Sequence, residues 1–238
     1  MSDPVFSLVI PCYNEGEGLH ELVEHCRFVA ERGSGEVILV DNGSTDASAE
    51  ILTSLVGEPD GPAGPGIVRW TRVRENRGYG YGITSGLAVS TAELVGWTHA
   101  DLQTDPADVL RAVRVRGGDR RVLVKGRRYG RPLGDRVFTA GMSLFESLLM
   151  RKPLRDINAQ PTLFDRQLMD EWGTPPDDFS LDLFAYFQAK RRGFTIRRFP
   201  VLFVPRQWGQ SSWNTDLAAK RKFIRRTVDY SLQLRRNV

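Results

Sequence analysis

Short apolar segments that alternate with amphipathic stretches are the feature that most constrains this fold. Five such segments lie in the first half of the chain, at 5–10, 36–40, 67–73, 92–97 and 121–126. Between them, segment 19–26 has apolar residues at the i, i+3, i+4, i+7 spacing of a buried helical stripe, and 46–55 and 79–89 supply two further helices. Strands that alternate with helices form a mainly parallel sheet with helices on both faces. The sequence therefore predicts an α/β fold.

Composition excludes several classes of protein. With 238 residues, 41% of them hydrophobic, the chain is long enough to bury one sizeable core. Two cysteines are too few for a disulfide framework, and the first residues lack the pattern of a signal peptide, so we expect a cytoplasmic protein. No apolar run reaches the roughly 18 to 20 residues that cross a bilayer. The net charge of +4 favours anionic partners, but it does not distinguish nucleic acid, phospholipid and a phosphorylated substrate.

Polar residues follow three of the apolar segments at the point where each ends. They are PCYNE at 11–15, DNGSTD at 41–46 and THADLQ at 98–103. Each alone also fits a turn with a helix cap. Because ligands of open α/β sheets bind outside the carboxyl ends of the strands, the three together predict a binding site at that edge.

Four motifs in order carry a resemblance to a known family. They are VIPCYNEGEGL, VDNGSTD, ENRGYGYGITSGL and HADLQTDP. This combination resembles family 2 glycosyltransferases, and within them the dolichol-phosphate mannose and polyprenyl-phosphate hexose synthases, over residues 5–213. The resemblance implies a GT-A fold, which is Rossmann-like and mostly parallel. It also implies inverting transfer of a hexose from a GDP- or UDP-linked donor to a polyprenyl or dolichyl phosphate.

The first two motifs are expected to hold the donor nucleotide. Asp41 follows a buried strand, and an ionised carboxylate is an acceptor suited to an N–H group of uracil or guanine. By the resemblance, Pro11, Tyr13 and Glu15 line the cleft for the base and ribose.

The third motif predicts an anion site. Asn76 and Gly78 precede a helix N-terminus, where backbone N–H groups and the helix dipole favour a phosphate. The glycines at Gly78, Gly80 and Gly82 permit close approach of backbone to ligand, although a packing role for Gly82 is equally open.

The fourth motif is expected to bind Mg²⁺ or Mn²⁺. At this position relatives have Asp-Ala-Asp-Leu-Gln, whereas this chain has HADLQ at 99–103. His99 therefore replaces the first aspartate, and Asp101 and Gln103 match the relatives. Alternation along an extended strand would direct all three side chains to one side. Asp101 and Gln103 supply oxygen ligands, whereas His99 could ligate Mn²⁺, contact a phosphate or fill space. We expect weaker metal affinity than in relatives.

The segments 123–132 and 135–150 resemble the acceptor loop and interfacial helix of polyprenyl-phosphate transferases. By that match Arg128 and Arg136 bind the acceptor phosphate, because guanidinium groups fit phosphate in a bidentate manner. A solvated basic loop is the alternative. Asp156 and Gln160 are candidates for contacts to the donor sugar or the acceptor.

Segment 200–214 resembles the part of the family that closes over the diphosphate, with Arg206 and Ser211 as the matching positions. A phosphate acceptor is already anionic, so catalysis needs positioning and charge neutralisation rather than a strong base. We therefore expect Asp101, Arg128 and Arg206 to carry catalysis, together with Arg136.

Two parts of the chain are expected. Residues 1–213 form the catalytic domain, with the acceptor-binding part at about 127–213, and 214–238 form a basic amphipathic helix. Such a helix is typical of an anionic membrane interface, and a docked surface helix is the alternative. We expect a peripheral protein at the inner face of the membrane, with no nucleic-acid partner and an oligomeric state that the sequence leaves open.

Two other functions remain open at this point, and the sequence disfavours a third. Asp182 lies near the position of a catalytic base in relatives that use a hydroxyl acceptor. A transferase fold disabled at His99 would bind a nucleotide sugar without turnover. A sugar-nucleotide pyrophosphorylase would need cations in the first motif, which lacks them.

Overall fold

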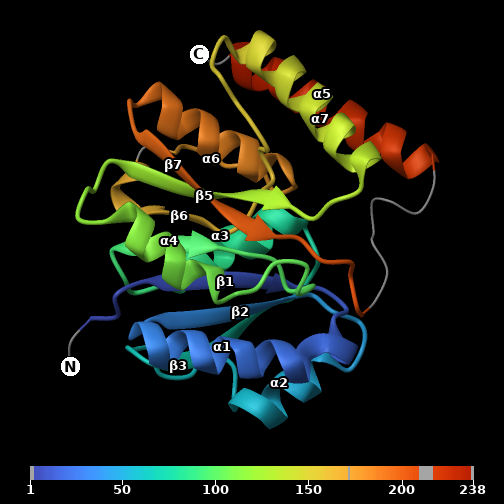
Figure 1. The fold of residues 1–238 in the computed structure, drawn as a ribbon. Helices are drawn as coiled ribbons and strands as arrows, with labels where there is room; N and C mark the ends of the chain where they lie inside the picture. The colour runs from blue at the N-terminus through green and yellow to red at the C-terminus, as the bar shows by residue number, and fades with distance from the viewer. Residues whose placement is uncertain (1–2, 171, 209–216, 237–238) are drawn as a thin grey trace.

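The computed structural model describes residues 3–170, 172–208 and 217–236. Within these residues one seven-stranded sheet has the order β3-β2-β1-β4-β6-β5-β7 (Figure 1). The strands are β1 (Ser7–Cys12), β2 (Glu36–Asn42), β3 (Ile67–Val73), β4 (Leu94–Trp97), β5 (Val122–Tyr129), β6 (Thr162–Asp165) and β7 (Thr195–Leu202). The helices are α1 (Leu19–Gly33), α2 (Ser48–Val56), α3 (Tyr79–Val89), α4 (Asp108–Arg116), α5 (Leu133–Met150), α6 (Ser180–Arg191) and α7 (Leu217–Arg236), with short 3-10 turns at Gly16–Gly18 and Arg166–Leu168.

The expected α/β fold is confirmed. All five predicted strands form, and β1 pairs in parallel with β2 and β4. Besides β7, which pairs in parallel with β5, the sequence did not predict β6, which lies antiparallel between β4 and β5. Its four residues are too few for a periodic pattern, and only pairing with both neighbours identifies it.

Helices cover both faces of the sheet, as the alternation of side chains in β1 shows. Leu8 and Ile10 pack into the core formed with α1, α2 and α4. Val9, between them, belongs to the core formed with α3 and α6. Because successive side chains of a strand point to opposite faces, a strand buried on both faces is apolar throughout. The site residues that follow the strands are therefore held by two packed layers.

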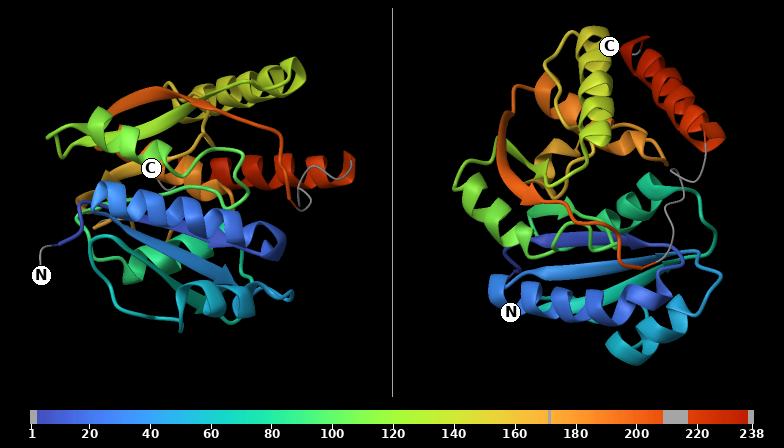
Figure 2. Two further views of the ribbon diagram at one scale, coloured as in Figure 1. Left: turned by 60° about the horizontal axis from the view of Figure 1, so that its bottom comes forward. Right: turned by 45° about the vertical axis from the view of Figure 1, so that its right-hand side comes forward.

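Helices α5 and α7 lie side by side beyond one end of the sheet (Figures 1 and 2). Ser231 of α7 is buried and donates a hydrogen bond from Oγ to Oε1 of Glu146 on α5, at 2.7 Å. The basic C-terminal helix thus exists and docks on the protein. Its buried positions include Ser231 and Leu234, whereas Leu232 is exposed. No helix in the described part of the chain is long and apolar enough to span a membrane.

Candidate functional site

Hydrogen bonds join the loop after β1 to the loop after β2. The two loops form one surface at the carboxyl edge of the sheet, which we call the rim. The backbone N–H of Asn14 donates to Oγ of Ser44 at 3.0 Å, and Oδ1 of Asn14 accepts from the N–H of Thr45 at 2.8 Å. Asp46 Oδ2 accepts from the N–H of Gly16 at 3.1 Å. Asn14 adopts a positive φ of 53°, a conformation that asparagine tolerates better than most residues. The rim holds the predicted donor residues at the carboxyl edge of the sheet.

Asp41 is fully buried near the end of β2, where it pairs in register with Cys12 of β1. Its Oδ1 accepts a hydrogen bond from the N–H of Ser44 at 3.0 Å. Its Oδ2 lies 3.1 Å from Nε of Arg72, an ion pair whose guanidinium is half exposed. That pair lacks hydrogen-bond geometry, so Oδ2 accepts no hydrogen bond from any described residue. An incoming N–H donor could use this oxygen if Arg72 moved aside, and the expected contact to a nucleobase stays a prediction.

The predicted anion site at the start of α3 is filled by protein. The carbonyl oxygen of Asp177 accepts from the N–H of Tyr81 at 3.0 Å, and its carboxylate pairs with Arg77 at 2.9 Å. A Cβ on Gly78 would meet the same carbonyl oxygen at 2.3 Å. Asn76 caps the loop by accepting from the N–H of Gly78 at 2.9 Å. The backbone at Asp177 is thus the close neighbour of Gly78, and binding of the donor by Asn76 and Gly78 stays a prediction.

The other two glycines of this motif also serve packing. A Cβ on Gly80 would lie 2.3 Å from the carbonyl oxygen of Pro176. A Cβ on Gly82 would lie 3.1 Å from the Asn42 side chain and 3.2 Å from Pro11. The packing alternative therefore describes both positions.

The loop after β4 differs from the expected extended strand. The strand ends at Trp97, and residues 100–104 form bends in which Leu102 has a φ of 53°. The expected alternation of His99, Asp101 and Gln103 is therefore wrong, because a turn replaces the pleat. The ring of His99 instead stacks on that of Tyr79, with centroids 5.4 Å apart.

Asp101 and Gln103 are nevertheless adjacent at this edge. Oδ1 of Asp101 accepts from the N–H of Gln103 at 3.2 Å, and Nε2 of Gln103 donates to the carbonyl of Val204 at 3.2 Å. Among the described residues, no group of three or more His, Cys, Asp or Glu side chains could hold a metal ion. One carboxylate and one amide oxygen fit a hard divalent cation only if a diphosphate supplies further oxygens.

The segment that follows β7 crosses the rim. Val204 donates its N–H to the carbonyl of Gln103 at 2.9 Å, and Nη2 of Arg206 pairs with Oε1 of Glu15. Trp208 Nε1 donates to Oε2 of Glu21 at 3.2 Å. Burial raises the pKa of the Glu15 carboxyl, and the Arg206 guanidinium opposes that rise. The structure thus brings two predicted residues together, Glu15 and Arg206. Ser211 lies outside the described residues.

Arg128 and Asp156 form the centre of a second polar cluster between β5 and α5. Arg128 donates from Nε to Oδ1 of Asp156 at 2.9 Å and from its backbone N–H to Oδ2 at 3.0 Å. Asp156 is held in turn, because its N–H donates to Oγ of Ser143 on α5 at 3.0 Å. Burial raises the pKa of Asp156, but the charge and hydrogen bonds of Arg128 outweigh burial and leave this pKa below its ordinary value. Arg131, which sequence reasoning missed, also reaches Asp156, whereas Arg136 lies exposed on α5.

Gln160 and Asp182 lie in the interior, so the expected contact of Gln160 with a ligand stays a prediction that would require this region to open. Both are fully buried. Oδ1 of Asp182 accepts from Nε2 of Gln160 at 2.7 Å and from Nε1 of Trp97 at 3.2 Å, and Nζ of Lys125 lies at 3.5 Å. An acceptor hydroxyl therefore cannot reach Asp182 in this conformation.

Helix α5 exposes apolar side chains to solvent. Leu133 is 72% exposed and Leu148 is 71% exposed. The other large apolar residues on this surface are Val137, Phe138, Leu144 and Phe145. The buried face of the helix carries Ser143, Glu146 and Met150 instead. Contiguous apolar surface of this kind is typical of an interaction face.

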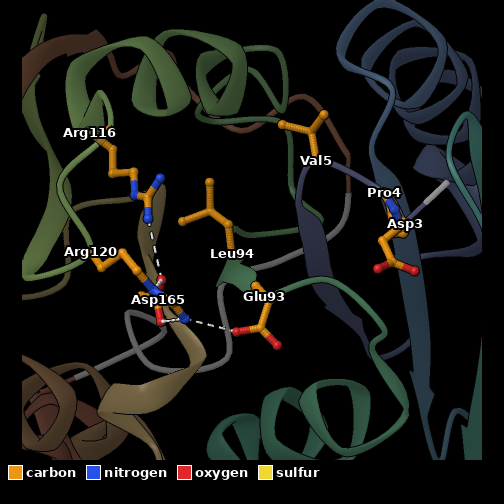
Figure 3. Close-up of a pocket in the computed structure, with 9 residues that line it drawn as sticks. Asp3, Pro4, Val5, Glu93, Leu94, Arg116, Arg120 and Asp165 are labelled. Carbon is orange, nitrogen blue, oxygen red and sulfur yellow. Dashed lines mark hydrogen bonds and ion pairs between the residues drawn. The ribbon is translucent and has the colours of Figure 1, made fainter.

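A cavity of about 360 Å³ lies at the opposite edge of the sheet, near the first residues of β1, β4 and β5 (Figure 3). Its charges neutralise one another: Arg120 pairs with Asp165 at 2.8 Å and with Glu93 at 3.0 Å, and Arg116 also reaches Asp165 at 3.3 Å. It is separate from the residues at the carboxyl edge.

Known protein families and sequences include relatives of this chain. The model of glycosyl transferase family 2 matches residues 7–184. An undecaprenyl-phosphate 4-deoxy-4-formamido-L-arabinose transferase from Sodalis glossinidius is 39% identical over 48% of this chain and 34% of its own length. One from Yersinia enterocolitica is 37% identical over 46% of this chain and 32% of its own length. The matched part thus spans about a third of these relatives.

Solved structures show the same fold. Glucosyl-3-phosphoglycerate synthase from Mycobacterium tuberculosis, in complex with Mn²⁺, UDP and glucosyl-3-phosphoglycerate, superposes with a TM-score of 0.72 at 18% identity, covering 98% of this chain and 80% of that one. A mannosyltransferase from Pyrobaculum calidifontis, in complex with GDP-mannose and Mn²⁺, gives a TM-score of 0.58 at 20% identity, covering 87% of this chain and 59% of that one. The GT-A fold expected from the sequence is confirmed.

Proposed function

Because this chain belongs to glycosyl transferase family 2, we propose that it transfers a sugar from a nucleoside diphosphate to a polyprenyl phosphate at a membrane surface. The sugar is a hexose in this proposal, linked to GDP or UDP. The observation that carries it is the mostly buried ion pair of Arg128 with Asp156. This pair lies next to helix α5, whose apolar side chains are exposed to solvent. A phosphate site beside an exposed apolar helix matches an acceptor that is anionic at one end and lipid at the other.

The donor would occupy the rim formed by the loops after β1, β2 and β4. Asp41 offers a buried oxygen to the base, and Tyr13, exposed at the rim, offers a flat surface. Arg206 would exchange Glu15 for the diphosphate, since a guanidinium binds phosphate oxygens as well as carboxylates. Because Arg206 would pair with Glu15 in the absence of donor and with the diphosphate in its presence, donor binding would change the contacts of the segment that follows β7.

A divalent cation would be held by Asp101 and Gln103 together with diphosphate oxygens. When bound, Mg²⁺ or Mn²⁺ neutralises charge on the departing nucleoside diphosphate. The protein residues position both substrates, and an acceptor phosphate is already ionised at neutral pH, so no side chain has to remove a proton. Attack from the face opposite the leaving group inverts the anomeric centre.

Two observations bear on the acceptor. The relatives from Sodalis and Yersinia carry undecaprenyl phosphate in their names, which supports a polyprenyl phosphate. The exposed apolar side chains of α5 support a position at the membrane surface, at its cytoplasmic face in this proposal. The hydroxyl-acceptor alternative requires Asp182 as base, and its enclosure by Lys125 and Gln160 argues against that reaction.

The direct test incubates the full chain with radiolabelled GDP- or UDP-sugars, Mn²⁺ or Mg²⁺ and undecaprenyl phosphate in vesicles. Label should enter an organic-extractable lipid, and Arg128→Gln should abolish most of that transfer. Label in a water-soluble saccharide would support the hydroxyl-acceptor alternative. Nucleotide binding without turnover under any metal would support a binding protein instead.

A thermal-shift panel identifies the donor beforehand. A ligand that binds only the folded chain raises the melting temperature, so GDP- and UDP-sugars with each metal can be ranked directly. The panel should include a UDP-linked 4-deoxy-4-formamido-L-arabinose as well as hexoses, because the named relatives transfer that sugar.

A further inference from the structure

We propose that Arg131 is the second phosphate-binding residue of the acceptor site, beside Arg128, and that Arg136 is not. The inference rests on the proposed function and identifies which cations bind its acceptor. It follows from the side chains around Asp156 and from how each guanidinium is already engaged.

Arg128 and Arg131 converge on one carboxylate. Nε of Arg128 lies 2.9 Å from Oδ1 of Asp156, and Nη1 of Arg131 lies 3.7 Å from the same oxygen. Their guanidinium carbons lie 5.5 Å and 5.6 Å from the centre of the Phe203 ring. One aromatic ring and one carboxylate thus hold both guanidinium groups, with side chains only 13% and 10% exposed.

The cluster has more positive charge than Asp156 neutralises. Arg198 also acts electrostatically on Asp156, and the Asp135 carboxylate acts on Arg131, so three guanidinium groups share two carboxylates in this cluster. Burial and the nearby charge of Arg128 lower the pKa of Arg131, and the carboxylates of Asp156 and Asp135 oppose that shift without cancelling it. Partly desolvated like charges are costly unless an anion balances them. A phosphate monoester, with a charge near −2 at neutral pH, is such an anion.

Both arginines keep donors for a ligand. The hydrogen bonds of Arg128 to Asp156 use Nε, Nη2 and the backbone N–H. Those of Arg131 use only Nη2, which donates to the carbonyl of Asp135 at 3.0 Å and to Oγ1 of Thr139 at 2.7 Å. Within the described residues Nη1 of Arg128 makes no hydrogen bond, and Nη1 of Arg131 makes only the 3.7 Å ion pair with Asp156, so both atoms can donate to phosphate oxygens. The bonds to Asp135 and Thr139 fix Arg131 on the first turns of α5.

The position of Arg131 also suits the lipid part of the acceptor. Leu133, two residues later, is 72% exposed, and Val137 is 64% exposed one turn further along α5. A prenyl chain attached to a phosphate at Arg131 could therefore continue directly over apolar surface. Arg136 is exposed on the same helix, with no side-chain contact to Asp156 among the described residues.

Calorimetric titration of the full chain with farnesyl phosphate tests this assignment. Arg131→Gln should weaken binding roughly ten- to a hundredfold, the usual effect of losing hydrogen bonds to a charged group. Arg131→Lys keeps the charge but loses the planar fork, so its affinity should lie between those of the wild type and Arg131→Gln. The matched control is Arg127→Gln, which removes the same charge from the neighbouring exposed position of β5 and should leave binding unchanged. Thermal melts identify variants that fail to fold.

Each outcome separates this inference from the proposed function. Tight farnesyl phosphate binding that Arg131→Gln leaves intact, or that Arg136→Gln weakens as strongly, would overturn the role of Arg131 while the acceptor class stands. Binding of inorganic phosphate that depends on Arg131, without any preference for farnesyl phosphate, would support the role of Arg131 and refute the lipid acceptor. Binding of neither probe by the wild type would refute both.

Discussion

Glu15 and Arg206 stand 191 positions apart in the sequence and form an ion pair across the rim of the candidate site. Both side chains are mostly buried, at 14% and 20% exposure, so the pair is more than a surface contact. It joins the loop after β1 to the segment after β7. A donor diphosphate would compete with Glu15 for this guanidinium.

Replacing Arg206 should therefore weaken donor binding. We expect Arg206→Gln to reduce affinity for the nucleoside diphosphate roughly ten- to a hundredfold, because a charged hydrogen-bond donor is lost. Calorimetric titration with UDP and GDP in the presence of Mn²⁺ measures this. Arg127→Gln is the control for loss of one positive charge. Equal affinities of Arg206→Gln and wild type would show that Arg206 remains with Glu15 when nucleotide binds.

Restoring the missing aspartate should strengthen metal binding. His99→Asp adds a hard oxygen ligand beside Asp101, so half-maximal activity should need roughly tenfold less Mn²⁺ or Mg²⁺. The same substitution at His20, an exposed residue of α1, controls for the added negative charge. Identical metal titrations of wild type and His99→Asp would contradict a ligand position at residue 99.

Gly80 should not tolerate a side chain. A Cβ there would lie 2.3 Å from the carbonyl oxygen of Pro176, so Gly80→Ala should destabilise the fold by about 1–3 kcal/mol. Gly141 lies in open space on α5, and Gly141→Ala should stabilise by about 0.5–1 kcal/mol. Urea unfolding of both variants measures the contrast. Equal effects would mean that the backbone near Pro176 adjusts freely.

The effect on stability of replacing the buried Lys125 should depend on whether Asp182 is present. Burial lowers the pKa of Lys125 to about 8, and the charge of Asp182 opposes that shift. Lys125→Met leaves the carboxylate uncompensated and should cost about 3–5 kcal/mol. Adding Asp182→Asn removes the charge yet keeps an acceptor for Gln160, so the double variant should recover much of the loss. A double variant as unstable as the sum of the two singles would refute the coupling.

Glu146 should make stability depend on pH. Burial between α5 and α7 raises the pKa of this carboxyl from 4.5 to about 7, with only a small opposing effect of Ser231. The folded chain then binds more protons than the unfolded chain between these values. Stability should therefore fall by on the order of 1–3 kcal/mol as pH rises from about 4.5 to 7. Glu146→Gln should remove this component, which unfolding curves at pH 5 and pH 8 can show.

Much of the fold was predictable because its signals are local. Five strands and the helices α1, α2 and α3 follow from the period of apolar residues over ten or so positions. The motifs after β1, β2 and β4 were expected at one edge because parallel strands place their carboxyl ends together. For these strands and helices, the pattern of apolar residues that causes them to form lies within a short stretch of sequence.

The tertiary structure alone decided which side chains meet. Gln160 belongs to a plausible motif but is buried against Asp182, and Asp177 fills the start of α3, where an anion was expected. Nothing in the basic loop distinguishes Arg131 from the arginines around it, and only its contact with Asp156 does so. Such contacts join residues tens to a hundred positions apart, and the packing of intervening helices sets them. The local period of apolar residues does not specify that packing. The sequence by itself therefore determined the strands and helices, and the tertiary structure decided which side chains of the site are in contact.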